Sequence, residues 1–462
     1  MAKTFTPRAY QRQAVDHIIN VPRCGLWAGM GMGKTVSTLT ALDAFFVAGE
    51  SAPALVVAPL RVARDTWTAE AAKWHHLRDI KVRPINGSIG ERRTALRDKD
   101  ANVFTINYEN LPWLVDTVGK QWPFSTVVAD ESTKLKGFRV KEGGARARAL
   151  GRVAHPRVKR FIELTGTPAP NGLVDLWGQI WFLDAGQRLG KSFESFQMRW
   201  FQAKKNSGGF SQLFPLPHAQ AEIEARLKDI CLTIDPRDHF DIKDPIRTTV
   251  PVELPARARG LYTDMERELF MQIGEYDIEA FNAAARTMKC LQICNGAVYV
   301  DDSGAWQEVH NAKLEALEDV MEEAAGMPIL VAYQFKSDLE RLRKAFPKGR
   351  LLSDAKEFKE FLTGNYPLGF AHPKSLGHGV DGLQNVSNII AFFGHWWDLE
   401  LRQQIIERVG PVRQAQAGFD RPVFIYDIVA ADTIDEVVLA RHESKREVQD
   451  LLLEAMKRKG YK

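Results

Sequence analysis

Short apolar runs alternate with helix-like stretches along the first 170 residues, and this alternation predicts a parallel β-sheet. Several runs are apolar at successive positions, as in strands that helices cover on both faces. Each run ends in a polar or small residue, at the strand end where open α/β sheets collect their ligands. The runs occupy residues 54–59, 101–107, 125–130 and 160–166.

The pattern changes at about residue 184 and returns at about residue 311. Between these positions, helix-like segments are separated by proline-containing breaks, which predicts a helical insertion and a linker. A second set of apolar runs then follows, at residues 328–334, 386–394 and 421–429.

The predicted fold class is therefore α/β, with two parallel-sheet lobes in tandem and helical insertions between them. The first lobe is expected to cover residues 1–245, with its helical insertion starting at about residue 184. The second is expected to cover residues 246–462 and to begin with a helical linker that reaches about residue 310.

The stretch CGLWAGMGMGKT, residues 24–35, is an apolar strand followed by a glycine-rich turn that ends in Gly-Lys-Thr. It predicts a phosphate site, because glycines at 29, 31 and 33 can take positive φ and point backbone N–H groups at an anion. Lys34 is expected to bridge the outer phosphates of a nucleoside triphosphate, and Thr35 to hold magnesium. Ala28 stands where the strict GxxxxGK[ST] pattern has its first glycine.

An acidic pair, Asp130 and Glu131, directly follows a short apolar run. A lone Asp-Glu pair is usually a solvated turn, but the preceding strand and the upstream Lys34 favour a catalytic interpretation. Asp130 is expected to hold magnesium through water, and Glu131 to orient and deprotonate the attacking water.

The composition, 45% hydrophobic and 26% charged over 462 residues, is that of a folded globular protein. Its formal net charge of +4 is small for this length, so any nucleic-acid contact is expected from a local basic groove. The four cysteines are too scattered for a disulfide framework or a zinc site, and Cys290 and Cys294 are expected to be core thiols. No apolar run is long enough for a membrane span and no leader is visible, so a cytoplasmic protein without a membrane partner is expected.

Six motifs follow one another in a recognisable order: MGMGKT in the glycine-rich turn, DESTKLKG at 130–137, LTGTPAPN at 164–171, LQICNG at 291–296, VAYQFKSDLERL at 331–342, and the run from Trp397 to Gln414. In these motifs the chain resembles the Swi/Snf-type group of superfamily 2 helicase-like ATPases, over nearly its whole length. The resemblance implies two RecA-like lobes that hydrolyse ATP with Mg²⁺ at the cleft between them, in a DNA-dependent manner.

The resemblance also implies roles for individual positions. Tyr10 and Gln11 fall where the family places its adenine-reading glutamine, and Gly382 is expected at the nucleotide. Arg408 falls on the arginine that reaches the γ-phosphate from the second lobe, where a planar cation stabilises transition-state charge. The residues expected to couple the ATP state to lobe movement are Thr165, Gly166, Thr167 and Gln404. The nucleotide-binding loop is expected to comprise Gly29, Met30, Gly31, Met32, Gly33, Lys34 and Thr35.

The last motif departs from the family pattern R-x-x-R-x-x-Q. Arg408 and Gln414 are present, but Pro411 stands where the second arginine belongs. Either Arg413 replaces the missing cation through a local backbone shift, or Arg408 works with one fewer cation.

The family's DNA contacts lie in turns after the strands, where backbone N–H groups and short polar side chains contact phosphates and do not read bases. Arg61 could instead be a solvated helix start, and the basic run at 141–160 could line the DNA groove or form a solvated face. Packing is favoured over base stacking for Trp396 and Trp397. The positions that correspond to the family's DNA contacts are Pro59, Arg61, Asn107, Tyr108 and Gln384.

We therefore expect an ATP-dependent translocase that moves along double-stranded DNA without sequence specificity, as a monomer, in replication, repair or remodelling of DNA. Its compact size is similar to that of family members from bacteria and bacterial viruses. Two alternatives stay open: a strand-separating helicase acting on single-stranded DNA or RNA, and a non-catalytic nucleic-acid-binding scaffold that would explain Pro411.

Overall fold

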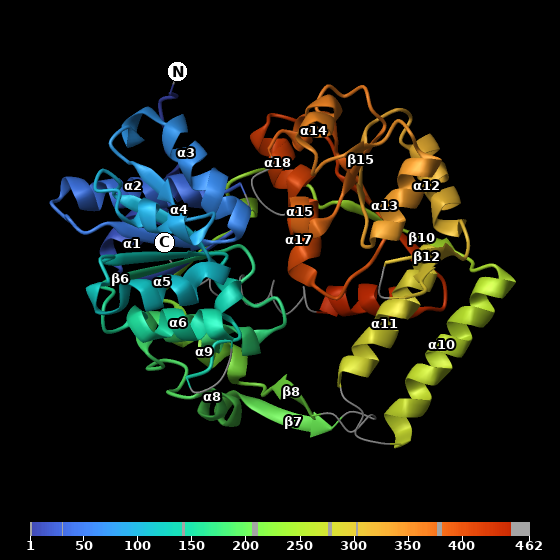
Figure 1. Ribbon diagram of the computed structural model, residues 1–462, viewed down its shortest axis with the longest axis horizontal. Helices are drawn as coiled ribbons and strands as arrows, with labels where there is room; N and C mark the ends of the chain where they lie inside the picture. Colours follow the sequence, from blue (N-terminus) through green and yellow to red (C-terminus); the bar gives the residue numbers. More distant parts are fainter. Residues whose placement is uncertain are drawn as a thin grey trace. The chain divides into compact units, whose positions relative to one another are not determined.

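The computed structural model describes residues 2–29, 31–140, 144–205, 211–275, 280–301, 304–376 and 381–444. They form two compact units, one with the described residues up to His239 and the other with those from Phe240 to Ser444. In Figure 1 the first unit is coloured from blue to green and the second from green to red.

The sheet of the first unit is parallel at each described strand pair. Its strands β2, β4 and β5 are buried at every position, as expected for strands covered on both faces. In order across the sheet, the strands are β3 (Val82–Pro84), β4 (Val103–Asn107), β2 (Ala54–Ala58), β5 (Thr126–Asp130), β6 (Arg160–Thr165), β1 (Arg23–Ala28) and β9 (Cys231–Ile234). The helices of this unit are α1 (Ala9–Asn20), α2 (Lys34–Val47), α3 (Trp67–Lys73), α4 (Ile89–Leu96), α5 (Leu111–Val118), α6 (Ala145–Ala154), α7 (Leu176–Asp184), α8 (Phe193–Trp200) and α9 (Ala219–Leu227).

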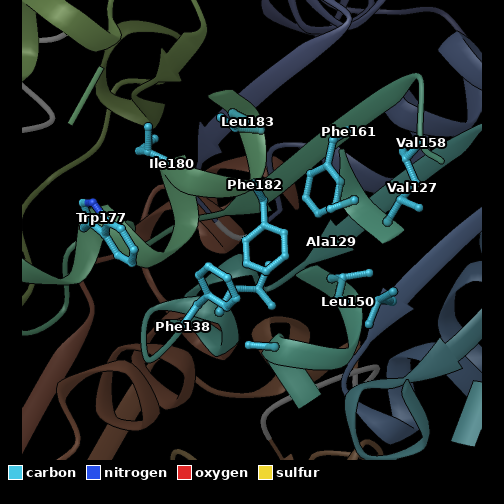
Figure 2. Packing of buried hydrophobic residues seen from close by; sticks show 14 of the residues in the cluster. Val127, Ala129, Phe138, Leu150, Val158, Phe161, Trp177, Ile180, Phe182 and Leu183 are labelled. Carbon is cyan, nitrogen blue, oxygen red and sulfur yellow. The ribbon is translucent and has the colours of Figure 1, made fainter. Parts of the chain in front are cut away.

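Aromatic side chains from three segments fill the core beside β5 and β6. Figure 2 shows the rings of Phe138, Phe161 and Phe182 together, close to Val127 and Ala129 of β5. The ring centroid of Phe182 in α7 lies 4.8 Å from that of Phe138 and 5.4 Å from that of Phe161 in β6. Burial of each such side chain contributes about 1.5–3 kcal/mol, so this packing anchors the two strands.

The predicted helical insertion contains strands as well as helices. β7 (Phe201–Lys205) and β8 (Ser211–Pro215) form a hairpin, and β9 joins the first sheet beside β1. β10 (Ile246–Val252) pairs along its whole length with a strand of the second unit. The insertion thus contains strands beside the predicted helices, and these strands were not predicted because β9 is only four residues long and most positions of β10 are exposed.

The second unit has its own parallel sheet, so the predicted α/β fold class with two parallel-sheet lobes is confirmed. Its strands in order are β10, β17 (Phe424–Ala430), β16 (Ile389–Phe392), β13 (Ile329–Ala332), β15 (Leu368–Ala371) and β14 (Arg350–Leu351). The helices are α10 (Ala256–Glu275), α11 (Ala280–Asn295), α12 (Ala312–Glu323), α13 (Lys336–Ala345), α14 (Ala355–Phe361), α15 (Pro373–Leu376), α16 (Leu383–Val386), α17 (Leu399–Val409) and α18 (Pro411–Gln416). A small hairpin, β11 (Ala297–Tyr299) and β12 (Trp306–Glu308), follows α11.

A buried polar cluster ties four segments of the second unit together. The ammonium of Lys313 in α12 is fully buried and lies 2.6 Å from Oδ2 of Asp435. It also donates to Oδ1 of Asn295 at 2.9 Å and to the carbonyl of Phe393 at 3.2 Å. Its three N–H groups thus have three acceptors, which is what a buried ammonium requires.

Among the described residues, no helix combines the length and the apolar character needed to cross a membrane. Cys290 and Cys294 are free and buried in α11, where they pack in the core of the second unit. The prediction that these two residues are core thiols is confirmed.

Candidate active site

The glycine-rich turn lies between the carboxyl end of β1 and the start of α2. Gly31 and Gly33 have φ of 79° and 78°, which leaves α2 to begin at Lys34. The Lys34 ammonium donates to the carbonyls of Ala28 at 2.6 Å and Gly29 at 3.2 Å. A helix N-terminus and a lysine side chain therefore meet at the turn, which is the arrangement that binds phosphate groups.

Two details of this turn differ from the sequence prediction. Gly29 does not have a positive φ; a Cβ there would lie 3.2 Å from Cγ of Pro236, so its advantage is close packing. Ala28 still belongs to β1, where it pairs with Ile234 of β9. The missing first glycine is tolerated because position 28 needs only strand conformation. Met32 is buried, and Met30 lies outside the described residues.

Gln11 lies directly against the turn. Its Oε1 accepts the backbone N–H of Arg8 at 2.9 Å, and a Cβ on Gly33 would lie 2.3 Å from its Nε2. Tyr10 is buried, with its ring centroid 4.7 Å from that of His239, and burial raises its pKa. The structure thus brings Gln11 to the glycine-rich turn, while adenine recognition stays a prediction.

The acidic pair stands at the carboxyl end of β5. Oδ2 of the buried Asp130 accepts a hydrogen bond from Nε1 of Trp67 at 2.9 Å. Burial, and then the neighbouring Glu131 charge, raise the pKa of Asp130 to about 6, while the Trp67 hydrogen bond and the Lys34 charge oppose this rise. Glu131 has a φ of 56°, a conformation that non-glycine residues adopt rarely and that often marks functional sites.

The Thr-Gly-Thr segment lies between the turn and the acidic pair, since β6 separates β1 from β5 in the sheet. Oγ1 of Thr165 accepts the backbone N–H of Thr167 at 3.0 Å. A Cβ on Gly166 would lie 3.4 Å from Cα of Gly29, so this segment contacts the turn closely. One edge of the first sheet therefore brings together the glycine-rich turn, the acidic pair and the predicted coupling segment.

In the second unit, the Asp381 carboxylate gathers three predicted site residues. Its Oδ1 accepts from the backbone N–H of Gly382 at 3.0 Å, from Nε2 of Gln384 at 3.3 Å and from Nη1 of Arg413 at 3.3 Å. Gly382 has a φ of 100°, which favours glycine at this position. The structure thus places Arg413 at the turn that carries Gly382 and Gln384.

Pro411 marks the junction of two helices. α17 ends at Val409, Gly410 is extended, and Pro411 is the first residue of α18, a position where proline costs no hydrogen bond. Arg408 therefore lies buried in the last turn of α17, whereas Arg413 lies in α18.

Two glutamines of the last motif, Gln404 and Gln414, are buried. Gln404 is buried in α17, where its Nε2 donates to Oε1 of Glu400 at 3.3 Å. Nε2 of Gln414 donates to the carbonyls of Ser387 and Val409 at 2.8 and 2.9 Å. Gln414 thereby ties α18 to the end of α17.

In the turn after β4, which is predicted to contact DNA, the side chains of Asn107 and Tyr108 point into the protein. Nδ2 of the buried Asn107 donates to Oε2 of Glu109 at 2.9 Å, and the hydroxyl of the buried Tyr108 donates to the carbonyl of Asp130 at 2.9 Å. A DNA contact at this turn would therefore use backbone groups. In the turn after β2, Pro59 and Arg61 are half-buried.

The basic helix α6 carries paired arginines. Arg146 lies 3.0 Å from Glu109 and Arg152 lies 2.7 Å from Asp116, both at the surface. These pairs favour the solvated-face interpretation of the basic run at those two positions.

The tandem tryptophans after β16 also favour packing over base stacking. Trp396 is buried against Phe392, with ring centroids 5.8 Å apart, so its ring serves the core. Trp397 is partly buried against a small cluster that contains Phe335.

Trp67 is, like Asp381, a residue at the candidate site that sequence reasoning misses. It follows the predicted phosphate-contact turn by six residues, and only the tertiary fold shows that its indole meets Asp130. A tryptophan in an otherwise polar helix start was the one available signal.

A family model for the SNF2-related domain matches residues 10–292. This chain belongs to the SNF2-related family. It is 55% identical to protein p41 of Acyrthosiphon pisum secondary endosymbiont phage 1 over 460 residues, which cover 99% of this chain and 100% of that protein. An uncharacterized ATP-dependent helicase of Mycoplasma genitalium is 23% identical over 439 residues, which are 91% of this chain and 39% of that protein. A solved Sulfolobus solfataricus SWI2/SNF2 ATPase core in complex with dsDNA has a TM-score of 0.45 at 22% identity, covering 98% of this chain and 94% of that chain.

Membership in the SNF2-related family confirms the Swi/Snf-type resemblance that the six motifs indicated. The chain is therefore an enzyme of the helicase-like ATPase class. The roles of individual residues stay predictions.

Proposed function

We propose that this SNF2-related protein hydrolyses ATP and uses the reaction to move along double-stranded DNA without reading its sequence. The observation that carries the proposal is the common sheet edge at which Lys34, Asp130 and Glu131 lie. The DNA part is supported by family membership and by the helicase relative, and the predicted contacts are with phosphates.

The residues at this edge fit ATP and magnesium. The N-terminus of α2 and the Lys34 ammonium suit the phosphates, and the oxygen donors of Thr35 and Asp130 suit Mg²⁺. The ion, when bound, would neutralise charge that develops on the phosphates. Glu131 then acts as the group that orients the attacking water and takes its proton.

The steady-state ATPase rate of the full chain tests this function. It is measured without nucleic acid, with single-stranded DNA and with duplex DNA at one low salt concentration, because phosphate contacts weaken steeply with salt. We expect strong stimulation by duplex DNA and no hydrolysis by Lys34→Ala. Stimulation by single strands alone would favour a strand-separating helicase. Absence of ATP hydrolysis under all three conditions would favour a non-catalytic nucleic-acid-binding scaffold.

The two arginines of the second unit are expected to differ in their effects. Arg408→Ala should lower kcat about a thousandfold if its cation serves the γ-phosphate. Arg413→Ala breaks the ion pair with Asp381 and should lower kcat only about tenfold if Arg413 positions the Gly382 turn. Equal thousandfold losses would instead assign Arg413 as the second cation, and the exposed Arg343→Ala provides the control.

A further inference from the structure

Two buried aromatic side chains connect the acidic pair to the turns that follow β2 and β4. Trp67, the first residue of α3, donates from Nε1 to Oδ2 of Asp130 at 2.9 Å. Tyr108, the first residue after β4, donates from its hydroxyl to the carbonyl of Asp130 at 2.9 Å and lies 3.4 Å from that of Glu131. At or shortly after each turn predicted to contact DNA in the first unit, one side chain thus donates a hydrogen bond to Asp130.

The segment between the first turn and Trp67 is continuous and well packed. It runs from Arg61 through one π-helical stretch, Val62–Thr66, into α3, and π-helical turns often occur at functional sites. Val62 and Ala63 are buried, and Oγ1 of Thr105 in β4 donates to the carbonyl of Ala63. A shift of the turn is therefore carried to Trp67, because packed elements move as units.

The two hydrogen bonds contribute to the orientation of the acidic pair. An indole N–H only donates, so Trp67 holds one carboxylate oxygen of Asp130, a carboxylate that also has a backbone hydrogen bond from Glu131. Glu131 is held in a backbone conformation with positive φ, and the Tyr108 hydroxyl contacts the carbonyls on both sides of its N–H. Loss of either donor would let the acidic pair reorient.

We infer that Trp67 and Tyr108 are positioning residues that transmit DNA contact at the turns after β2 and β4 to Asp130 and Glu131, and so make ATP hydrolysis depend on DNA. This inference rests on the proposed function. DNA phosphates that order the two turns would order the two donors, and the donors would order the acidic pair. A merely structural role predicts equal losses with and without DNA.

The test compares Trp67→Phe, Tyr108→Phe and the double variant with the parent full-length chain. The measured quantities are kcat and KM for ATP with and without saturating duplex DNA, and the Kd for duplex DNA without ATP. Each single variant is expected to lower the DNA stimulation ratio about tenfold through kcat, as for the loss of one hydrogen bond, with the KM for ATP and the Kd for DNA unchanged.

The matched controls remove an indole N–H or a phenolic O–H at positions away from the acidic pair. Trp177 is buried in the first unit and its Nε1 donates to the carbonyl of Gly190 at 2.9 Å, whereas Tyr262 is buried in the second unit. Trp177→Phe and Tyr262→Phe should keep the parent ratio. If Trp67→Phe fails to fold, the inference is tested with Tyr108→Phe alone, because this substitution removes only the hydroxyl and keeps the aromatic ring.

An unchanged stimulation ratio in Tyr108→Phe, with kcat lowered equally in both conditions, would overturn the inference and leave the proposed function intact. A parent protein that duplex DNA does not stimulate would overturn the proposed function itself, and this inference with it. The two failures are therefore separated by the parent measurement alone.

Discussion

Glu131→Gln is expected to lower kcat for ATP hydrolysis at least about a hundredfold, because a glutamine amide cannot take the proton of the attacking water. Glutamine has nearly the same size as glutamate, so the substitution should add no strain to the positive-φ backbone at position 131. Nucleotide binding should persist, since Lys34 and the α2 N-terminus are untouched. Single-turnover hydrolysis and equilibrium binding of ATP measure the two quantities.

Glu318→Gln supplies the matched control, because Glu318 lies exposed in α12 of the second unit. It should hydrolyse ATP at the parent rate. A Glu131→Gln protein that keeps more than about a tenth of the parent kcat would show that another group serves as the base.

Lys313→Met is expected to destabilise the second unit by about 3–5 kcal/mol. The substitution leaves Asp435 fully buried without its cation and Asn295 without its donor. Because a buried pair replaced as a whole can be nearly neutral, the double variant Lys313→Met with Asp435→Leu should recover a large part of that loss.

Amide hydrogen exchange of the full chain measures this loss locally. Peptides from β13 and β16 should exchange faster in Lys313→Met, while peptides from β5 and β6 serve as an internal control in the other unit. Unchanged exchange in β16, or a double variant less stable than the single one, would show that the ion pair does not hold this sheet together.

Most strands that are apolar at successive positions were predicted, although β15 has such a run and was not. β2, β4, β5, β13 and β16 all have this pattern, which burial on both faces produces. β9 and β10 were missed because one is very short and the other is exposed at most positions, so pairing with β1 and β17 decides their conformation. No local pattern contains that information.

The candidate site, like the strands, could be predicted only in the parts that local sequence determines. The glycine-rich turn, the acidic pair and the Thr-Gly-Thr segment each follow a strand of one parallel sheet, and their meeting at one edge could therefore be predicted. The inward orientation of Asn107 and Tyr108 and the indole contact of Trp67 could not, because they depend on side-chain packing between segments distant in sequence.

The place of β9 also has a consequence for synthesis on the ribosome. β1, which precedes the glycine-rich turn, lies between β6 and a strand that ends at Ile234, and Gly29 packs on Pro236. Until that stretch has emerged, β1 is an open sheet edge of the kind that pairs with other chains. A nascent chain paused between residues 165 and 231 therefore exposes an aggregation-prone strand, and nucleotide binding should first appear only after the polypeptide has grown past this point.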